Sequence, residues 1–405
     1  MTDDAPVSGT SPKYLTEPAA KAAGSVVPVG EESLHWQPWA TPVLLDARTG
    51  AILQAFDGSP IEDLAQALAE VEQRPLEQVR FELEMVARHL AGNGLLEDAR
   101  VRPRWSPAAL NRPVTPCDSE AWNLSKAQIT DLVVGGRKAT CIVGDPEVFD
   151  VLTSQDHFEV LGPPEDIMFT PIELILAMAP GPRGVHRLFG RAGRVLTRST
   201  DRDEVVRAFF SNLDSLAWTR SSEEQVWLDA AALSSHTNGV ALLSGRALYD
   251  WARMARPLER AGYALLETPM VAISVEDGRV SVVAPPAPDP AVVAMAHKCM
   301  GDDRPVRPDT YGDLTVRRID LIATDEDMTA LRDNGHDPDA IDAGLAAQRL
   351  ALLAHTAALD IFPEDPPPQE RTMAILQGVA NLALTPGVRT RAHSQIKDLT
   401  KSLTS

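Results

Sequence analysis

The fold is decided by residues 239–253, which read GVALLSGRALYDWAR. Residues 240–243 form a continuous apolar run, which is typical of a strand buried on both faces. Ser244 and Gly245 are turn-forming residues, and the residues after them favour a helix. A strand, a tight turn and a helix in this order form the frame on which many α/β proteins hold phosphate groups.

Similar patterns on both sides of this stretch predict a mixed α/β region over residues 121–400. Strands are expected at residues 139–143, 195–197, 226–233, 240–243, 263–266, 270–273, 280–283 and 318–322. The turn at Asp277-Gly278 predicts a hairpin. Helices are expected at residues 147–152 and 203–216. A further helix is expected to run from Asp337, as its N-cap, to about residue 359, and two closing helices follow it.

Composition bounds the class of protein. The chain has 405 residues, which suggests two or three domains of roughly 150 residues each. The net charge of -19 disfavours nucleic-acid and anionic-membrane partners, because phosphate contacts need clustered Lys and Arg. The sequence has no apolar run long enough to span a membrane, and its acidic first residues do not resemble a secretory signal. We therefore expect a cytoplasmic protein.

The N-terminal part of the chain divides into an arm, a small domain and a linker. Residues 1–32 are polar and rich in Pro, Gly and Ala, so we expect a mostly disordered arm. Residues 33–100 are expected to form a first domain with short strands at 34–36 and 43–45. Its three helices are expected at residues 47–56, from Pro60 with Ser59 as N-cap, and after Pro75. Prolines mark residues 101–120 as a linker.

The pattern of a helix, Asp57-Gly58-Ser59, two helices and then Asn93-Gly94-Leu95-Leu96 resembles the PqqD family of winged-helix-like peptide-recognition domains. Such domains, also called RiPP recognition elements, occur in pathways that modify ribosomally made peptides. The resemblance implies that the leader of a precursor peptide adds as a strand to the sheet edge, beside the third helix. It places the peptide-binding residues at Val43, Leu44, Leu45, Asp46, Val79, Arg80, Leu83, Glu84 and Ala87.

Two other interpretations of this region remain open. Apolar residues such as Leu83 and Val86 are equally compatible with the plain core of a winged-helix domain. A DNA-binding winged helix is disfavoured, because acidic residues outnumber Arg80 and Arg88 on the candidate recognition helix.

Residues 121–400 resemble the HPr kinase/phosphatase-like family in the order of a strand, a phosphate-binding loop, a helix and a further strand. The frame is visible at residues 227–231, 242–245 and 261–266, but the residues that hold phosphate and metal in that family are replaced. The degenerate nucleotide site comprises Gly245, Asp250, Trp251, Ala252, Arg253, Thr268 and Pro269. The resemblance therefore implies a fold without phosphoryl transfer and without a cofactor.

Other candidate chemistry is sparse. Cys117, Cys141 and Cys299 are too far apart for a metal motif, so no metal is expected. A core role is expected for Cys299, and the alternative is a reactive thiol, because Lys298 and His297 are basic neighbours of the kind that lowers a thiol pKa.

Together these features predict a noncatalytic recognition protein. Its first domain would bind the leader of a ribosomal precursor peptide, and its kinase-like part would dock separate modifying enzymes. The combination resembles the recognition proteins of daptide-type pathways, in which a dehydrogenase and an aminotransferase remodel the peptide C-terminus. The alternatives are a divergent peptide kinase or another enzyme on the same scaffold, and a regulator with a DNA-binding head.

Overall fold

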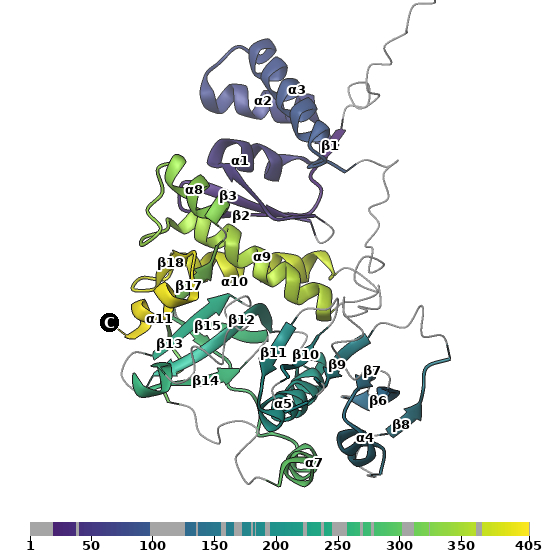
Figure 1. The fold of residues 1–405 in the computed structure, drawn as a ribbon. Helices are drawn as coiled ribbons and strands as arrows, with labels where there is room; N and C mark the ends of the chain where they lie inside the picture. Colours follow the sequence, from purple (N-terminus) through teal and green to yellow (C-terminus); the bar gives the residue numbers. More distant parts are fainter. Residues whose placement is uncertain are drawn as a thin grey trace, which may run out of the picture.

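The structure is a computed structural model (Figure 1). It describes residues 19–37, 40–97, 126–134, 137–154, 159–165, 172–179, 181–182, 184–190, 195–221, 225–235, 239–244, 257–267, 270–276, 279–301, 312–323, 325–361 and 367–404. Helices and three main sheets alternate along the chain, which confirms the expected α/β class. None of the described helices is long and apolar enough to cross a membrane.

The N-terminal unit is a three-stranded antiparallel sheet, in the order β2-β3-β4, carrying three helices. A separate short pair joins β1 to β5. The elements are β1 (Ala19–Lys21), β2 (Ser25–Val29), β3 (Glu32–Trp36), β4 (Val43–Asp46), α1 (Ala47–Ala55), β5 (Asp57–Pro60), α2 (Ile61–Glu72) and α3 (Leu76–Gly92).

Two expectations for this unit are wrong. Residues 19–32 of the predicted disordered arm contain β1 and β2, because Val26, Val27 and Val29 all find apolar partners and become buried. Residues 1–18 lie outside the described part. The second helix begins at Ile61 without a side-chain cap, since residues 57–60 pair with β1 instead and the Ser59 amide donates to Asp57.

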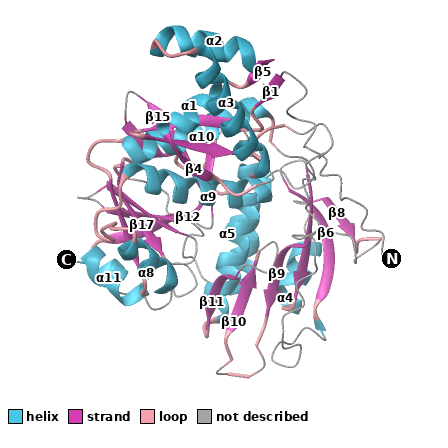
Figure 2. Ribbon diagram, turned by 90° about the horizontal axis from the view of Figure 1, so that it is seen from above, coloured by secondary structure: helices cyan, strands magenta, loops and turns pink. Residues whose placement is uncertain are grey.

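The middle of the chain forms a six-stranded sheet in the order β11-β10-β9-β7-β6-β8. Figure 2 shows this sheet beside the next one, with α5 running along it. The elements are β6 (Gln128–Val134), β7 (Arg137–Val143), α4 (Pro146–Thr153), β8 (Glu159–Gly162), β9 (Ile172–Ala177), β10 (His186–Phe189), β11 (Val195–Ser199), α5 (Arg202–Ser221) and, from later in the chain, α7 (Pro290–Met300).

The last region forms a seven-stranded sheet in the order β16-β15-β12-β13-β17-β18, with β14 paired to β12. Its strands are β12 (Val226–Ser235), β13 (Gly239–Ser244), β14 (Tyr263–Glu267), β15 (Met270–Glu276), β16 (Arg279–Val282), β17 (Val316–Ile322) and β18 (Arg389–His393). Its helices are α8 (Asp325–Asp333), α9 (Ala343–Ile361), α10 (Gln369–Leu384) and α11 (Ile396–Thr404). The predicted buried strand at residues 240–243 is thus confirmed as part of β13.

The predicted start of the helix at Asp337 is wrong. Asp337 forms an isolated bridge with Ala340, and α9 begins at Ala343. The carboxylate that serves the new helix end is Asp342, which accepts a hydrogen bond from the Leu345 amide at 2.9 Å.

One hydrophobic core joins the N-terminal unit to the seven-stranded sheet. Val27, Val29, Leu34 and Trp36 are buried in the same cluster as side chains of β12, β13, β17, α9 and α10. Figure 1 shows α9 and α10 lying between the small sheet and the large one. The N-terminal unit is therefore packed onto the body of the protein through one face of its sheet.

Candidate functional site

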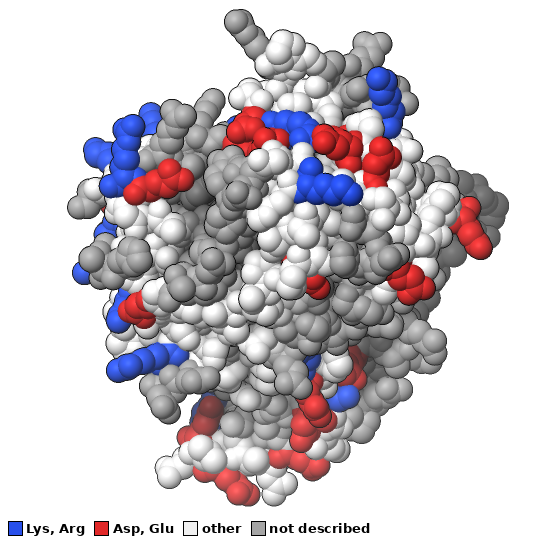
Figure 3. Space-filling model, turned by 90° about the horizontal axis from the view of Figure 1, so that it is seen from below, with Lys and Arg blue, Asp and Glu red and all other residues white. Residues whose placement is uncertain are grey.

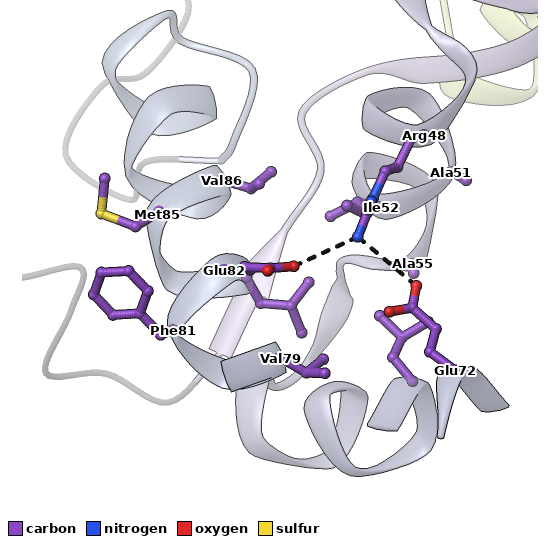
Figure 4. Close-up of a pocket in the computed structure, with 12 residues that line it drawn as sticks. Arg48, Ala51, Ile52, Ala55, Glu72, Val79, Phe81, Glu82, Met85 and Val86 are labelled. Carbon is purple, nitrogen blue, oxygen red and sulfur yellow. Dashed lines mark hydrogen bonds and ion pairs between the residues drawn. The ribbon is translucent and has the colours of Figure 1, made fainter. Parts of the chain in front are cut away.

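A groove of about 500 Å³ lies between α1 and α3, with the end of α2 closing one side (Figure 4). Most of its lining is apolar. The lining residues are Arg48, Ala51, Ile52, Ala55, Leu68, Glu72, Val79, Phe81, Glu82, Leu83, Met85 and Val86.

Helix α1 presents one face to the groove and the opposite face to the sheet. Arg48, Ala51, Ile52 and Ala55 follow the spacing of neighbours on one helix face. Gly50, on the other face, lies against the Ser33 side chain of β3 so closely that no Cβ fits there. This close contact holds the groove floor firmly on the sheet.

Helix α3 supplies both buried and exposed apolar groups. Val79 and Leu83 are 3% and 2% exposed and line the groove from the α3 side. Phe81 and Met85 lie one turn apart on the rim and are 62% and 47% exposed. Figure 4 shows both side chains at the outer edge of the helix. Large apolar side chains left in water beside an apolar groove are typical of an interaction surface.

The charged groups at the groove are unequally paired. Arg74 binds Glu82 through both of its terminal nitrogens and lies 2.9 Å from the carboxylate of Glu72. Arg48 lies 3.5 Å from Glu82 and 3.8 Å from Glu72 (Figure 4). The hydrogen bonds from Arg74 lower the pKa of the Glu82 carboxyl, so both partners stay charged.

Strand β4 is the last strand of its sheet among the described residues, and the chain continues from it into α1, which lines the groove. It pairs with β3 on one side, from Val43 opposite His35 to Asp46 opposite Glu32. Asp46 caps α1 by accepting from the Thr49 amide at 2.9 Å and from its hydroxyl at 2.5 Å. These hydrogen bonds lower the pKa of Asp46. Arg48, which lines the groove, follows Asp46 by two residues.

The nine residues expected to bind peptide occupy four different environments. Val79 and Leu83 line the groove, whereas Ala87 is buried in the core behind it. Arg80 and Glu84 point to another side of α3, in ion pairs with each other and with Glu62, Glu77 and Arg88. The remaining four, Val43, Leu44, Leu45 and Asp46, make up β4.

Sequence reasoning missed the α1 face and the exposed pair Phe81 and Met85. One signal was present, because α3 carries apolar residues on more of its circumference than a helix with a single buried face needs. The place of Arg48 in the groove had no signal in the sequence, because it depends on α3 packing opposite α1.

The expected degenerate nucleotide site, Gly245, Asp250–Arg253, Thr268 and Pro269, lies outside the described residues. Next to it, the ends of the parallel strands β13, β17 and β18 are closely tied. The Ile322 amide donates to Ser244 Oγ at 2.9 Å. Asp320 is completely buried, and its two oxygens lie 2.5–2.8 Å from Arg318 nitrogens and 2.6 Å from His393 Nε2. Arg318 also binds Ser402 of α11, so this carboxylate serves as a structural anchor.

The thiol of Cys299 is not activated. Burial raises its pKa to about 12 and outweighs the opposing effect of Arg202. The basic neighbours therefore do not activate the thiol, and Cys299 is a core residue of α7, which is the role favoured from the sequence. Cys141 is likewise buried, while Cys117 lies outside the described residues.

Within the described ranges, His, Cys, Asp and Glu side chains form no group of three or more that is placed to hold a metal ion. Figure 3 shows the face opposite the N-terminal unit, where basic and acidic side chains are interspersed among neutral ones. The comparisons with known proteins found no matching family model, no matching curated protein and no matching solved structure. The geometry of the α1–α3 groove and the β4 edge is therefore what a functional proposal has to rest on.

Proposed function

We propose that this protein recognises the leader of a ribosomally made precursor peptide and presents the peptide to separate modifying enzymes. The peptide adds as a strand to the outer edge of β4 and places side chains in the α1–α3 groove. The observation that carries the proposal is a strand edge, unpaired among the described residues, that is followed in the chain by α1, one wall of an apolar groove.

The edge strand supports binding through the peptide backbone. A free strand edge exposes a row of N–H and C=O groups that a second chain can satisfy, which is the basis of β-strand addition. Val43 is 37% exposed and pairs with His35, whose neighbour Ser33 lies against α1. Because alternate residues of a strand share a face, and directly paired residues do too, Val43 lies on the face of the sheet that α1 covers.

The groove supports selection by side chains. Its floor is apolar, and its rim carries Phe81 and Met85, which an occupant would shield from water. Methionine and aromatic side chains adapt to different apolar partners, as peptide-binding surfaces require.

The rest of the molecule supports the role of presentation. The small sheet is fixed to the body by its shared core, so a peptide on β4 is held in a defined position relative to the large sheet. In this proposal the body of residues 121–400 is the docking partner of the modifying enzymes, such as a dehydrogenase, and itself transfers no phosphate.

Fluorescence polarisation with labelled leader peptides encoded beside the gene tests the proposal. Strand addition uses the amides of alternate peptide residues, so N-methylation of one alternating set is expected to weaken binding about 10-fold or more. N-methylation of the other set leaves binding nearly unchanged. Absence of binding by every leader, or equal sensitivity of the two sets, would contradict the proposal.

A further inference from the structure

Among the described residues that line the groove, Arg48 is a cation whose bonding capacity is largely unused. Arg48 and Arg74 face the same two carboxylates, Glu72 and Glu82. Arg74 makes the short contacts and its side chain is 26% exposed, whereas the side chain of Arg48 is 65% exposed. Charge-assisted hydrogen bonds have lengths of about 2.7–2.9 Å, so the 3.5 Å and 3.8 Å contacts of Arg48 are weak.

The carboxylates at the groove are less available than Arg48. Glu82 is held by Arg74 from two directions, and Glu72 shares the same guanidinium. A basic group of an incoming peptide would have to compete with Arg74 for both. A carboxylate of an incoming peptide meets in Arg48 a planar guanidinium with free donors, which suits bidentate recognition.

The position of Arg48 in the chain determines where along a bound peptide the acidic residue lies. Arg48 is two residues beyond the end of β4 and one turn before Ala51 and Ile52 on the groove floor. A peptide that leaves the β4 edge therefore passes Arg48 as it enters the apolar part of the groove. Its acidic residue and its apolar anchor must be close neighbours in sequence.

From this geometry we infer that the groove selects peptides in which a bulky apolar side chain lies within about two residues of an Asp or Glu, with Arg48 binding the acidic side chain. The apolar side chain packs between Ile52, Leu83 and Val86. This inference rests on the proposed peptide recognition and adds to it the chemistry of the recognised sequence.

A selection experiment tests the inference without knowledge of the natural leader. The probe is a displayed library of random 12-residue peptides, selected on the immobilised full-length protein. The wild-type protein is expected to enrich Leu, Ile, Met or Phe next to Asp or Glu. The Arg48→Glu variant is expected to enrich Lys or Arg in the acidic position and to keep the apolar anchor.

Direct binding of the best acidic peptide then gives the size of the effect. Arg48→Glu is expected to weaken it about 10-fold or more, Arg48→Lys by less, and replacement of the peptide acid by Lys to restore binding to the Glu variant. The matched control is Lys21→Glu, since Lys21 is a comparably exposed cation of β1 that pairs with Glu97 away from the groove. That variant is expected to bind like the wild type, and thermal melts check that every variant is folded.

The outcomes separate the inference from the proposed function. Peptides that share an apolar anchor but no acidic residue, or equal losses for Arg48→Glu and Lys21→Glu, overturn the role of Arg48 while peptide recognition stands. Selection that yields no binding peptide at all overturns both.

Discussion

The two faces of the small sheet β2-β3-β4 have opposite roles. One face places Val27, Leu34 and Trp36 in the large core shared with α9 and α10. The other face carries Val26 and Ser33, which pack against α1 and its neighbours. The first face is closed by the body of the protein, whereas the helices on the second face leave a groove open to solvent.

This difference shows how a small sheet obtains a fixed position on a larger body. A sheet of three short strands has little core of its own, and burial of one face against a large body supplies the missing apolar contacts. The helices on the open face can then carry exposed apolar side chains, such as Phe81 of α3, while the sheet beneath them stays folded. The sequence predicts a first domain at residues 33–100. In the structure this domain is attached to the body of the protein through a shared hydrophobic core.

The strongest test of the difference between the two faces is a substitution in the buried face of the sheet. Leu34 is completely buried between the sheet and α9–α10, so Leu34→Ala is expected to lower the free energy of unfolding by about 2–5 kcal/mol. Its cross-strand neighbour Leu44 is only half-buried, and Leu44→Ala is expected to cost less. Urea unfolding followed by circular dichroism measures both.

The shape of the unfolding transition is as informative as its midpoint. If the small sheet and the body share one core, Leu34→Ala shifts a single cooperative transition. A separate early transition, with the main one unchanged, would show that the N-terminal unit unfolds by itself.

The helices of the N-terminal unit were predictable from sequence because their signals are local. Residues 47–56 and those after Pro75 show helical periodicity, and the structure has α1 and α3 there. The strand β2 was not predictable, because Val27 and Val29 gain their partners from α9 and α10, which lie far along the chain. The groove was hidden for the same reason, since Arg48 and Phe81 come from separate helices and only tertiary packing brings them together.

A second prediction concerns how firmly the open face is built. Gly50 of α1 lies against Ser33 of β3 with no room for a Cβ, so Gly50→Ala forces α1 away from the sheet. We expect a loss of about 1–3 kcal/mol, as for other overpacked sites. Gly92, the last residue of α3, has open space around its Cα, and Gly92→Ala is expected to gain about 0.5–1 kcal/mol by reducing the entropy lost on folding.

Thermal and chemical unfolding of these two glycine variants are compared side by side. A Gly50→Ala protein as stable as the wild type would mean that α1 adjusts freely, and the groove floor would then be adaptable. Reduced peptide binding by Gly50→Ala, with Gly92→Ala unaffected, would link the close contact of α1 to the shape of the groove.

The smallest expected effect is a pH dependence that compares the two faces directly. His355 of α9 lies on the closed face, with its ring 5.7 Å from that of Trp36, and burial lowers its pKa from the ordinary value of 6.5. His35 lies on the other face, where its Nε2 is 2.5 Å from the Ala23 carbonyl oxygen, and burial is again the main cause of a lowered pKa. Because the unfolded chain binds these protons more readily, stability is complete above about pH 6.5 and falls as the pH decreases below that value.

His355→Phe keeps an aromatic ring against Trp36 but removes the titrating group, so it is expected to flatten the fall in stability between pH 7.5 and pH 5.5. The slope that remains belongs in part to His35 and the open face. Urea midpoints at several pH values measure both slopes. The Nδ1 atom of His355 is buried and has no hydrogen-bond partner among the described residues, so a charge there has no nearby compensation. An unchanged slope in His355→Phe would mean that His355 takes up its proton at little cost, which requires water to reach the closed face and would remove the contrast between the two faces.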